Sequence, residues 1–195
     1  MRTLLNVLLV CSFTSFSWSA EAPTAADIAA TSTVAEAVIH TPRGDIHVSL
    51  FPKTAPISVA NFVNLTKAKF FDGLAFHRVE PGFVIQGGDP NSREGATAEQ
   101  REKIGAGGPG YTIPAEIGEK NPEKHLAGTL AMADAGLNTA GSQFYLTMAP
   151  QSFLDGRYTV FGRVLSPKDL EVIRAVKAGD RFTVEIIAPD AAKKD

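Results

Sequence analysis

Apolar and polar side chains alternate with a period of two in two stretches of the chain. Residues 45–50 read DIHVSL and residues 181–186 read RFTVEI, so that every second side chain is large and apolar. Successive side chains of a strand point to opposite faces, and such alternation is therefore typical of a strand with one buried and one solvated face. Both stretches are predicted to be strands, one near each end of the fold.

Further strands are expected between these two. Residues 37–41 are separated from 45–50 by the turn-forming Pro42, Arg43 and Gly44, which predicts an opening hairpin. The remaining segments with strand character are 74–79, 83–87, 128–132, 143–147 and 158–164.

Only two segments are predicted to be helical. Residues 56–68 begin with Pro56 in the first turn, behind Thr54 as the candidate N-cap. Residues 168–178 follow a proline, carry apolar side chains at spacing three and stop at Gly179. Many short strands with two helices far apart in the sequence favour a mainly β fold, a closed barrel or a sandwich with helices packed on it, over alternating βαβ units.

The beginning of the chain has the pattern of a targeting segment. Residues 1–20 combine a positive charge at Arg2 with a mostly apolar stretch at 4–16 and small residues near the end, which predicts a signal peptide. Residues 21–34, rich in Ala and Thr, are expected to form a flexible leader. One domain at 35–189 and a polar tail at 190–195 complete the predicted organisation.

The predicted signal peptide determines where the protein is expected to act. Its apolar stretch of about thirteen residues is shorter than the roughly twenty that span a bilayer, so we expect cleavage, no stable membrane anchor and a periplasmic or secreted protein. A permanent transmembrane helix and a lipoprotein signal using Cys11 are the less favoured alternatives. Cys11 is the only cysteine, and the mature chain would therefore contain no disulfide.

Composition and charge narrow the choice of partner. With 195 residues, of which 44% are hydrophobic and 21% charged, the chain has the composition of one ordinary globular domain with short extensions. Its 19 basic and 21 acidic residues give a net charge of -2. This balance argues against a nucleic-acid or anionic-membrane surface and favours a small or peptide-like partner.

Three kinds of functional site are disfavoured by the sequence around the residues that would form them. Residues 105–110 match G-x-G-x-x-G, but no strand precedes them and no helix follows, so we expect a tight loop without a nucleotide. The four histidines do not have metal-ligand spacings and no cysteine accompanies them, so we expect no metal. No G-x-S-x-G nucleophile elbow occurs, which disfavours a serine hydrolase. The long Gly/Pro-rich stretch 89–111 is expected to border a site.

Two segments remain, 76–89 and 128–162. The first reads FHRVEPGFVIQGGD and places Arg78 on one short strand, with Phe83 and Gln86 beyond a turn. An inward Arg78 would be a cation among apolar side chains that needs partners such as the amide of Gln86. An outward Arg78 on a solvated face is supported equally well by periodicity alone.

At these segments the sequence closely resembles the cyclophilin-type peptidyl-prolyl cis/trans isomerases, in their bacterial exported form. The matches occur in the family's order: FHR at 76–78, PGF at 81–83, QGGD at 86–89, GSQF at 141–144, LDG at 154–156 and VFG at 160–162. The resemblance extends over about 37–187. It implies an eight-stranded closed antiparallel β-barrel capped by two helices, with a substrate groove on its outer face.

The resemblance also implies the function and the site. The expected activity is isomerisation of X-Pro peptide bonds in proline-containing polypeptides, assisting the folding of exported proteins, by a monomer without cofactor. Arg78 corresponds to the family's catalytic arginine, Phe83 to the floor of its proline pocket and Gln86 to the amide that holds arginine and substrate. The other matching positions are expected to bind substrate: Val84, Ala133, Asp134, Gln143, Tyr145, Phe153, Leu154 and Tyr158.

Several site positions depart from the best-known eukaryotic form of the family. Val84 stands where methionine is common, Tyr145 where phenylalanine is usual, Phe153 where tryptophan is usual and Tyr158 where histidine is usual. Asp134 replaces a frequent asparagine. Because Phe153 lacks the indole donor that helps to hold cyclosporin, weak binding of that drug is expected.

The chemistry of amide rotation favours a functional Arg78 over a surface charge. No bond is broken in the reaction, and a cationic donor to the amide nitrogen stabilises the twisted state. We therefore expect Arg78 to be a buried functional group. The alternative is a proline-peptide-binding module or chaperone without turnover, which would not need a cation at that nitrogen.

Overall fold

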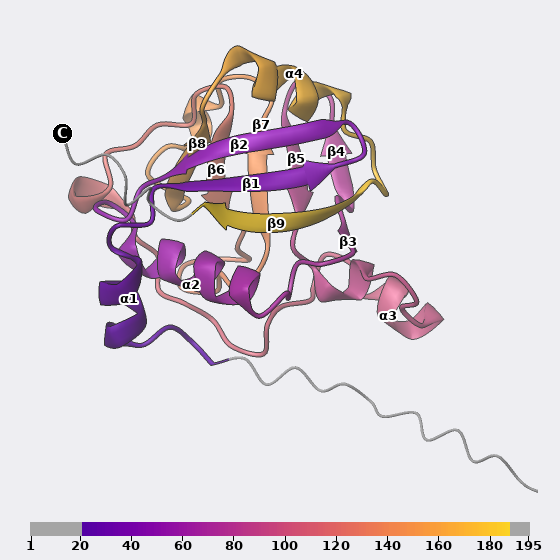
Figure 1. Ribbon diagram of the computed structural model, residues 1–195, viewed down its shortest axis with the longest axis horizontal. Helices are drawn as coiled ribbons and strands as arrows, with labels where there is room; N and C mark the ends of the chain where they lie inside the picture. Colours follow the sequence, from indigo (N-terminus) through magenta and orange to yellow (C-terminus); the bar gives the residue numbers. More distant parts are fainter. Residues whose placement is uncertain (1–20, 188–195) are drawn as a thin grey trace, which may run out of the picture.

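The computed structural model describes residues 21–187. In this part of the chain nine strands form one curled antiparallel sheet (Figure 1). The strands of this described part are β1 Glu36–Thr41, β2 Gly44–Leu50, β3 Leu74–Ala75, β4 Arg78–Glu80, β5 Val84–Gly87, β6 Thr129–Met132, β7 Phe144–Thr147, β8 Val160–Val164 and β9 Arg181–Ile187. Their order across the sheet is β3-β9-β1-β2-β8-β6-β7-β5-β4. The expected mainly β fold is confirmed, as is the opening hairpin β1–β2.

One predicted strand is divided in the structure. Residues 74–79 were expected to form a single strand, but they form β3 and β4 on either side of Phe76 and His77. β3 pairs with β9, and β4 pairs with β5 at the other end of the sheet order. Within the described residues no ladder joins β3 to β4, and the expected closed eight-stranded barrel is therefore not confirmed.

The helices lie mainly at the two ends of the curled sheet. Those of the described residues are α1 Ala25–Thr31, α2 Pro56–Lys67, α3 Ala98–Glu102 and α4 Pro167–Ala175, with short 3-10 turns at Pro90–Ser92, Gly118–Lys120 and Ser152–Leu154. α2 and α4 occupy opposite ends of the sheet (Figure 1). Both were predicted. α4 ends earlier than expected because Val176 is already extended, with φ -61° and ψ 140°.

The prediction of only two helices is wrong, because α1 and α3 are also helical. α1 lies within the expected flexible leader, where Thr24 and Asp27 form a capping box: the Asp27 amide donates to Oγ1 of Thr24 at 3.2 Å, and the Thr24 amide donates to Asp27 at 2.8 Å. These reciprocal bonds satisfy amides that a helix start leaves unpaired. The signal segment 1–20 and the tail 190–195 lie outside the described residues.

The N-terminus of α2 is capped from a distant part of the chain. Thr54 was expected to cap it, but its hydroxyl has no hydrogen-bond partner among the described residues. Instead the carboxylate of Glu116 accepts from the amides of Ile57 and Ser58, each at 2.8 Å, and from the Ser58 hydroxyl at 2.7 Å. A negative group at a helix N-terminus also interacts favourably with the helix dipole.

Phenylalanine rings fill the inside of the curled sheet. Phe62 of α2 packs edge-on against Phe144 of β7 at 5.6 Å between ring centroids, and with tilted rings against Phe161 of β8 at 5.4 Å. Phe144 contacts Phe182 of β9 at 5.6 Å. Strand alternation turns the neighbouring Tyr145 to the opposite face of β7, away from these rings. That outer face carries the candidate site.

Candidate active site

Three neighbouring strands place a row of side chains across the outer face of the sheet. Arg78 of β4 is directly opposite Gln86 of β5, and Gln86 is directly opposite Tyr145 of β7. Cross-strand partners share one face of a sheet and lie within contact distance. The register therefore brings together three residues that are up to 67 positions apart in the chain, as the difference between 145 and 78 shows.

Most of the predicted site residues line one cavity of about 150 Å³. The lining residues are Arg78, Phe83, Val84, Gln86, Ala133, Asp134, Tyr145, Leu154 and Tyr158. Its walls are about equally polar and apolar, with a guanidinium, an amide and a carboxyl group beside the apolar side chains. Such a mixture suits a ligand with an apolar ring and a polar backbone.

The guanidinium of Arg78 is half-exposed at this cavity, with 47% of its side chain accessible. The expectation that it would be buried is therefore wrong. Its Nε and one terminal nitrogen donate to Oε1 of Glu80 at 2.8 and 2.6 Å, and the other terminal nitrogen donates to Oε1 of Gln86 at 3.3 Å. The guanidinium also lies 5.7 Å from the ring centroid of Phe83. These partners orient the cation and leave it N–H groups for a ligand.

Glu80 was not predicted as a site residue, although the period of the strand places it beside Arg78. Residues two apart in a strand lie on the same face, so Glu80 and Arg78 of β4 are bound to be neighbours. The carboxylate of Glu80 is itself 49% exposed. Because ion pairs in water contribute little to stability, its role here is to orient the guanidinium.

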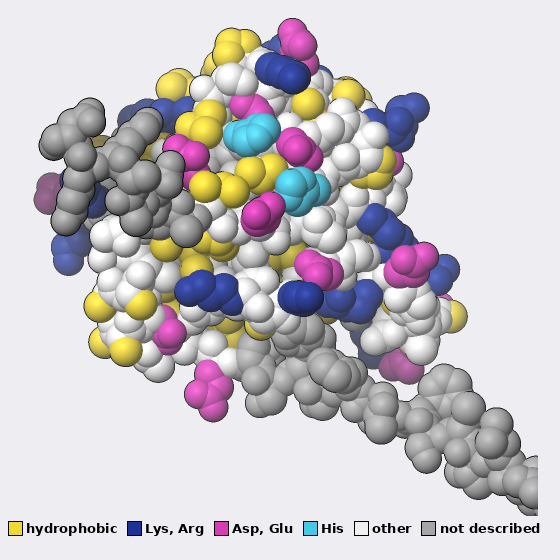
Figure 2. Space-filling model, viewed as in Figure 1, with side chains coloured by type: hydrophobic (Ala, Val, Ile, Leu, Met, Phe, Trp, Pro, Cys, Tyr) yellow, Lys and Arg dark blue, Asp and Glu magenta, His cyan; other side chains and the backbone are white. Residues whose placement is uncertain are grey.

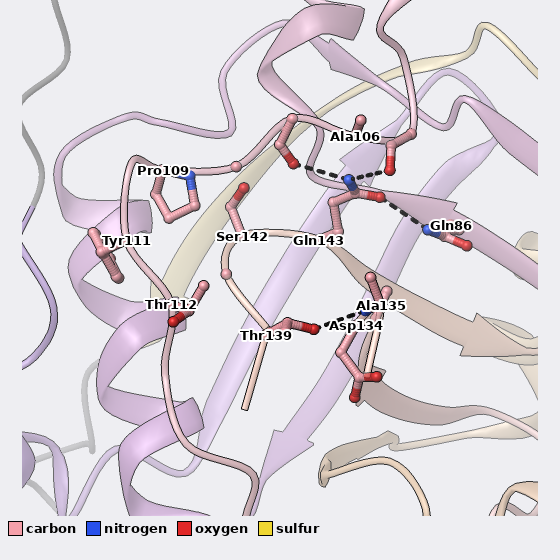
Figure 3. Close-up of a pocket in the computed structure, with 15 residues that line it drawn as sticks. Gln86, Ala106, Pro109, Tyr111, Thr112, Asp134, Ala135, Thr139, Ser142 and Gln143 are labelled. Atoms are coloured by element: carbon pink, nitrogen blue, oxygen red, sulfur yellow. Dashed lines mark hydrogen bonds between the residues drawn. The ribbon is translucent and has the colours of Figure 1, made fainter. Parts of the chain in front are cut away.

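A line of amide hydrogen bonds supports Arg78 from behind. Nε2 of Gln86 donates to Oε1 of Gln143 at 2.9 Å. Nε2 of Gln143 in turn donates to the carbonyl oxygens of Gly105 and Gly107 at 3.0 and 2.9 Å (Figure 3). Gln143 does not line the smaller cavity, and it acts on that cavity through Gln86.

A second, larger cavity of about 250 Å³ adjoins the first and shares Gln86, Ala133 and Asp134 with it (Figure 3). One wall is the glycine-rich segment 105–109, so the long loop that was expected to border a site does border a cavity. The buried carboxylate of Asp89 holds this segment by accepting from the amides of Gly105 and Gly107 at 2.5 and 3.0 Å.

Asp134, which lies between the two cavities, has an altered acidity. Partial burial raises the pKa of its carboxyl group, and the amide of Gly136, which donates to it at 3.0 Å, opposes that rise. The group is thus easier to protonate than an ordinary aspartate.

Phe153 is the predicted site residue that the structure leaves outside both cavities. Its side chain is 60% exposed and stacks on Phe83 with 5.8 Å between ring centroids and 21° between ring planes. It extends the apolar surface beyond the smaller cavity and does not form its wall.

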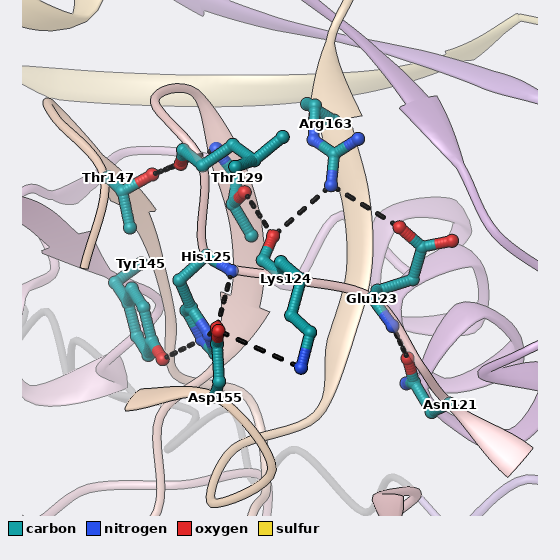
Figure 4. A network of polar contacts seen from close by, with 10 residues as sticks. Asn121, Glu123, Lys124, His125, Thr129, Tyr145, Thr147, Asp155 and Arg163 are labelled. Carbon is teal, nitrogen blue, oxygen red and sulfur yellow. Dashed lines mark hydrogen bonds and ion pairs between the residues drawn. The ribbon is translucent and has the colours of Figure 1, made fainter. Parts of the chain in front are cut away.

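Behind Tyr145 lies a polar network that sequence reasoning did not find (Figure 4). The Tyr145 hydroxyl lies 2.9 Å from Nε2 of His125, and Nδ1 of His125 lies 3.1 Å from Oδ1 of Asp155. Burial raises the pKa of Tyr145. The three residues are separated by ten or more positions, and no local spacing marks them as partners.

The other histidines differ in exposure and in their partners. His40 of β1 and His47 of β2 are hydrogen-bonded to carboxylates, and histidine side chains are visible on the face shown in Figure 2. His40 lies 2.8 Å from Asp45, and His47 lies 2.9 Å from Asp169. Nδ1 of His77 is buried without a partner in the described chain. Across residues 21–187, no group of three or more His, Cys, Asp or Glu is placed to hold a metal ion.

The helices between residues 21 and 187 are too short or too polar to cross a bilayer.

Comparison with known proteins gives consistent matches. A family model described as "Cyclophilin type peptidyl-prolyl cis-trans isomerase/CLD" matches residues 37–190. The chain is 46% identical over 157 residues to the peptidyl-prolyl cis-trans isomerase of Synechococcus elongatus, covering 80% of this chain and 99% of that protein. It is 48% identical over 135 residues to peptidyl-prolyl cis-trans isomerase B of Bacillus subtilis, covering 69% and 85%.

A solved structure is also similar to this chain. The cyclophilin-type peptidyl-prolyl cis-trans isomerase of Cryptosporidium parvum, crystallised in the presence of the dipeptide Ala-Pro, matches with a TM-score of 0.65 and 28% identity. The match covers 79% of this chain and 99% of that chain.

Proposed function

This chain belongs to the cyclophilin-type peptidyl-prolyl cis/trans isomerases and catalyses rotation about X-Pro bonds, and from that premise we propose that the smaller cavity receives the prolyl ring beside Arg78. The observation that carries this proposal is the register that aligns Arg78, Gln86 and Tyr145 across β4, β5 and β7. The alternative, a binding module without turnover, has no support among these relatives, which are all named as isomerases.

Arg78 supplies the chemistry that the reaction needs. The X-Pro amide resists rotation by about 20 kcal/mol because resonance gives its C–N bond double-bond character. In the twisted state the nitrogen becomes pyramidal and its lone pair can accept a hydrogen bond. A permanently charged guanidinium is a suitable donor, and each 1.4 kcal/mol or so of preference for the twisted state gives about tenfold in rate.

The rest of the site holds the peptide while one part of it turns. Phe83, Tyr145 and Leu154 offer apolar contacts to the pyrrolidine ring, and their place in the cavity lining supports that role. Ala133 and Asp134 lie where the two cavities meet and are placed to contact the substrate backbone. Fixing one side of the amide lets rotation occur on the other.

Substitution of Arg78 tests the assignment. Arg78→Ala is expected to lower kcat/KM by about tenfold or more. The fold should persist because the partner Glu80 is half-exposed and is not left as a buried charge. Arg101→Ala on α3, whose side chain donates to the Ala96 carbonyl away from both cavities, is the matched control. Isomerisation rates equal to wild type in Arg78→Ala would refute the role of Arg78.

We also propose that the chain is exported and acts as a monomer on proline-containing clients outside the cytoplasm. The support is the charge and apolar pattern of residues 1–20. Expression of the full chain in a bacterium, cell fractionation and mass measurement of the product test it. Recovery of the protein from the cytoplasm with residues 1–20 intact would contradict export. Light scattering of the purified product gives its oligomeric state.

A further inference from the structure

Tyr145 brings a polar group to the apolar wall of the smaller cavity. The side chain is 5% exposed, lines the cavity and meets the ring of Tyr158 edge-on at 5.9 Å between centroids. Its hydroxyl oxygen lies 2.9 Å from Nε2 of His125, a residue that lines neither cavity. The orientation of this hydroxyl thus depends on a group outside the site.

His125 is itself held at both ring nitrogens. Its side chain has no exposed surface. Nδ1 lies 3.1 Å from Oδ1 of Asp155, and the backbone amide of His125 donates to the same oxygen at 2.8 Å (Figure 4). The ring also stacks on that of Tyr145 with 15° between the planes. A ring fixed in this way can fix its partner.

The direction of each hydrogen bond follows from the charge of Asp155. The amide of His125 lowers the pKa of the Asp155 carboxyl group, which is therefore an anion at neutral pH and only accepts hydrogen bonds. Nδ1 of a neutral His125 must then carry the proton, and Nε2 offers a lone pair. The Tyr145 hydroxyl donates to it, so its hydrogen points toward His125.

We propose that His125 is a positioning residue of the proline pocket: by accepting the hydroxyl hydrogen of Tyr145, it presents the phenol ring to the prolyl ring and keeps the hydroxyl dipole engaged elsewhere. The inference rests on the proposed function, which places the prolyl ring in the smaller cavity. It explains how a tyrosine can form part of a wall that contacts an apolar ring, because its one polar atom is already satisfied.

Protonation of His125 reverses this arrangement. The charged groups near the pair are Asp155 and Lys124 beside His125, and Asp134 beside Tyr145, where Tyr158 also lies. Burial lowers the pKa of His125 from its ordinary 6.5, and Asp155 partly opposes that shift. When Nε2 carries a proton, the Tyr145 oxygen must accept, and its own hydrogen turns away from His125. Peptide affinity should therefore weaken in acid.

Two substitutions separate the roles of the two nitrogens. His125→Asn keeps an N–H near the Nδ1 position and removes the acceptor for Tyr145, whereas His125→Gln places an amide oxygen near the Nε2 position. The measurement is the Kd of a tetrapeptide containing Ala-Pro, by NMR titration. We expect His125→Asn to raise Kd by about fivefold and His125→Gln by less than about twofold.

The same substitution in a Tyr145→Phe background tests whether His125 acts through the hydroxyl. There His125→Asn should change Kd by less than about twofold relative to Tyr145→Phe alone, because no hydroxyl remains to be oriented. An equal effect of His125→Asn in both backgrounds would show a merely structural role and overturn the proposal.

Wild-type protein provides a readout that needs no variant. The ring ¹⁵N shifts of His125 at about pH 7.5 should report a protonated Nδ1 and a bare Nε2, and a protonated Nε2 in the neutral ring would overturn the proposal. Kd for the peptide should rise in wild type as the pH falls below 6.5, the ordinary pKa of histidine, and should not rise in His125→Gln. Equal pH profiles of these two proteins would likewise contradict it.

Failure of this inference is distinguishable from failure of the proposed function. Full activity of Arg78→Ala would contradict the proposal that the smaller cavity binds the prolyl ring. Loss of activity in Arg78→Ala, together with unchanged peptide affinity in His125→Asn, would remove only the role of His125.

Discussion

Gln86 and Gln143 are joined by one hydrogen bond of 2.9 Å, from Nε2 of Gln86 to Oε1 of Gln143, and this bond orients both amides. Because Nε2 of Gln143 is directed to the carbonyl groups of the glycine-rich loop, its oxygen faces Gln86. The oxygen of Gln86 is then left to accept from Arg78. The direction of the Arg78 guanidinium is thus linked to a loop on the far side of the larger cavity.

Replacing Gln143 by leucine should disturb Arg78 without touching it. Gln143→Leu leaves Nε2 of Gln86 and two loop carbonyls without their partner, and because these groups are exposed or only partly buried, water replaces some of the lost hydrogen bonds. We expect kcat/KM to fall by about tenfold and the free energy of unfolding to fall by about 1–3 kcal/mol. Stopped-flow isomerisation and urea unfolding measure the two. Undiminished kcat/KM would show that the hydrogen bonds of Gln143 and Gln86 do not orient Arg78.

Two adjacent glycines of the loop should respond differently to alanine. A Cβ at Gly107 would collide with the side chains of Asp89 and Asn91, whereas a Cβ at Gly108 meets nothing within 4 Å. Gly107→Ala is therefore expected to displace the loop from Asp89, to lower the thermal midpoint by several degrees and to lower kcat/KM through Gln143. Gly108→Ala is the matched control and should change neither quantity. Similar behaviour of the two variants would contradict the packing described.

The pair Arg43 and Asp180 should make stability depend on pH in the acid range. Two hydrogen bonds from Arg43, at 2.8 and 3.0 Å, lower the pKa of Asp180 below its ordinary 3.8. A depressed carboxyl pKa contributes stability that is present above 3.8 and lost as pH falls through the pKa of the folded state.

Arg43→Gln should therefore lower the urea midpoint at neutral pH, and the difference from wild type should shrink as the pH falls below 3.8. Lys53→Gln removes the same charge from a position without an ion pair in the described chain and is the control. A difference between wild type and Arg43→Gln that is constant with pH would argue against the linkage.

Cyclosporin should inhibit this enzyme weakly. Phe153 stands where tryptophan is usual in the best-known eukaryotic form that the sequence resembles, and its ring is exposed and carries no hydrogen-bond donor. Phe153→Trp is expected to lower the inhibition constant by about tenfold, the effect of one added hydrogen bond with its apolar contact. Inhibition of proline-peptide isomerisation measures both proteins. Nanomolar inhibition of the wild-type protein would contradict the prediction.

Local sequence patterns were sufficient to predict most of the strands and the two longer helices. Alternation placed β2 and β9, and Pro56 together with Pro167 marked the beginnings of α2 and α4 within a residue. These signals succeed because strand period, helix period and proline geometry act between near neighbours in the chain. The T-x-x-D capping signal of α1 was equally local and was overlooked.

The candidate site, too, was predicted in part from local patterns and depends in part on the tertiary structure. Ordered motifs named the residues around the smaller cavity, and nine of the eleven predicted positions do line it, while Gln143 and Phe153 do not. Their exclusion follows from side-chain direction and exposure, which sequence alone does not report. The half-exposed state of Arg78 is of the same kind, since it depends on how Glu80, Gln86 and Phe83 surround it.

The sequence by itself determined most of the strands, the main helices, the family and the residue types of the site, because short patterns of neighbouring residues indicate each of these. Only the tertiary structure decided that residues 74–80 divide between two edges of the sheet, that Glu116 caps α2, and that Asp155 and His125 stand behind Tyr145. These are contacts between residues far apart in the chain. Their geometry arises when the sheet curls, and no local period encodes it.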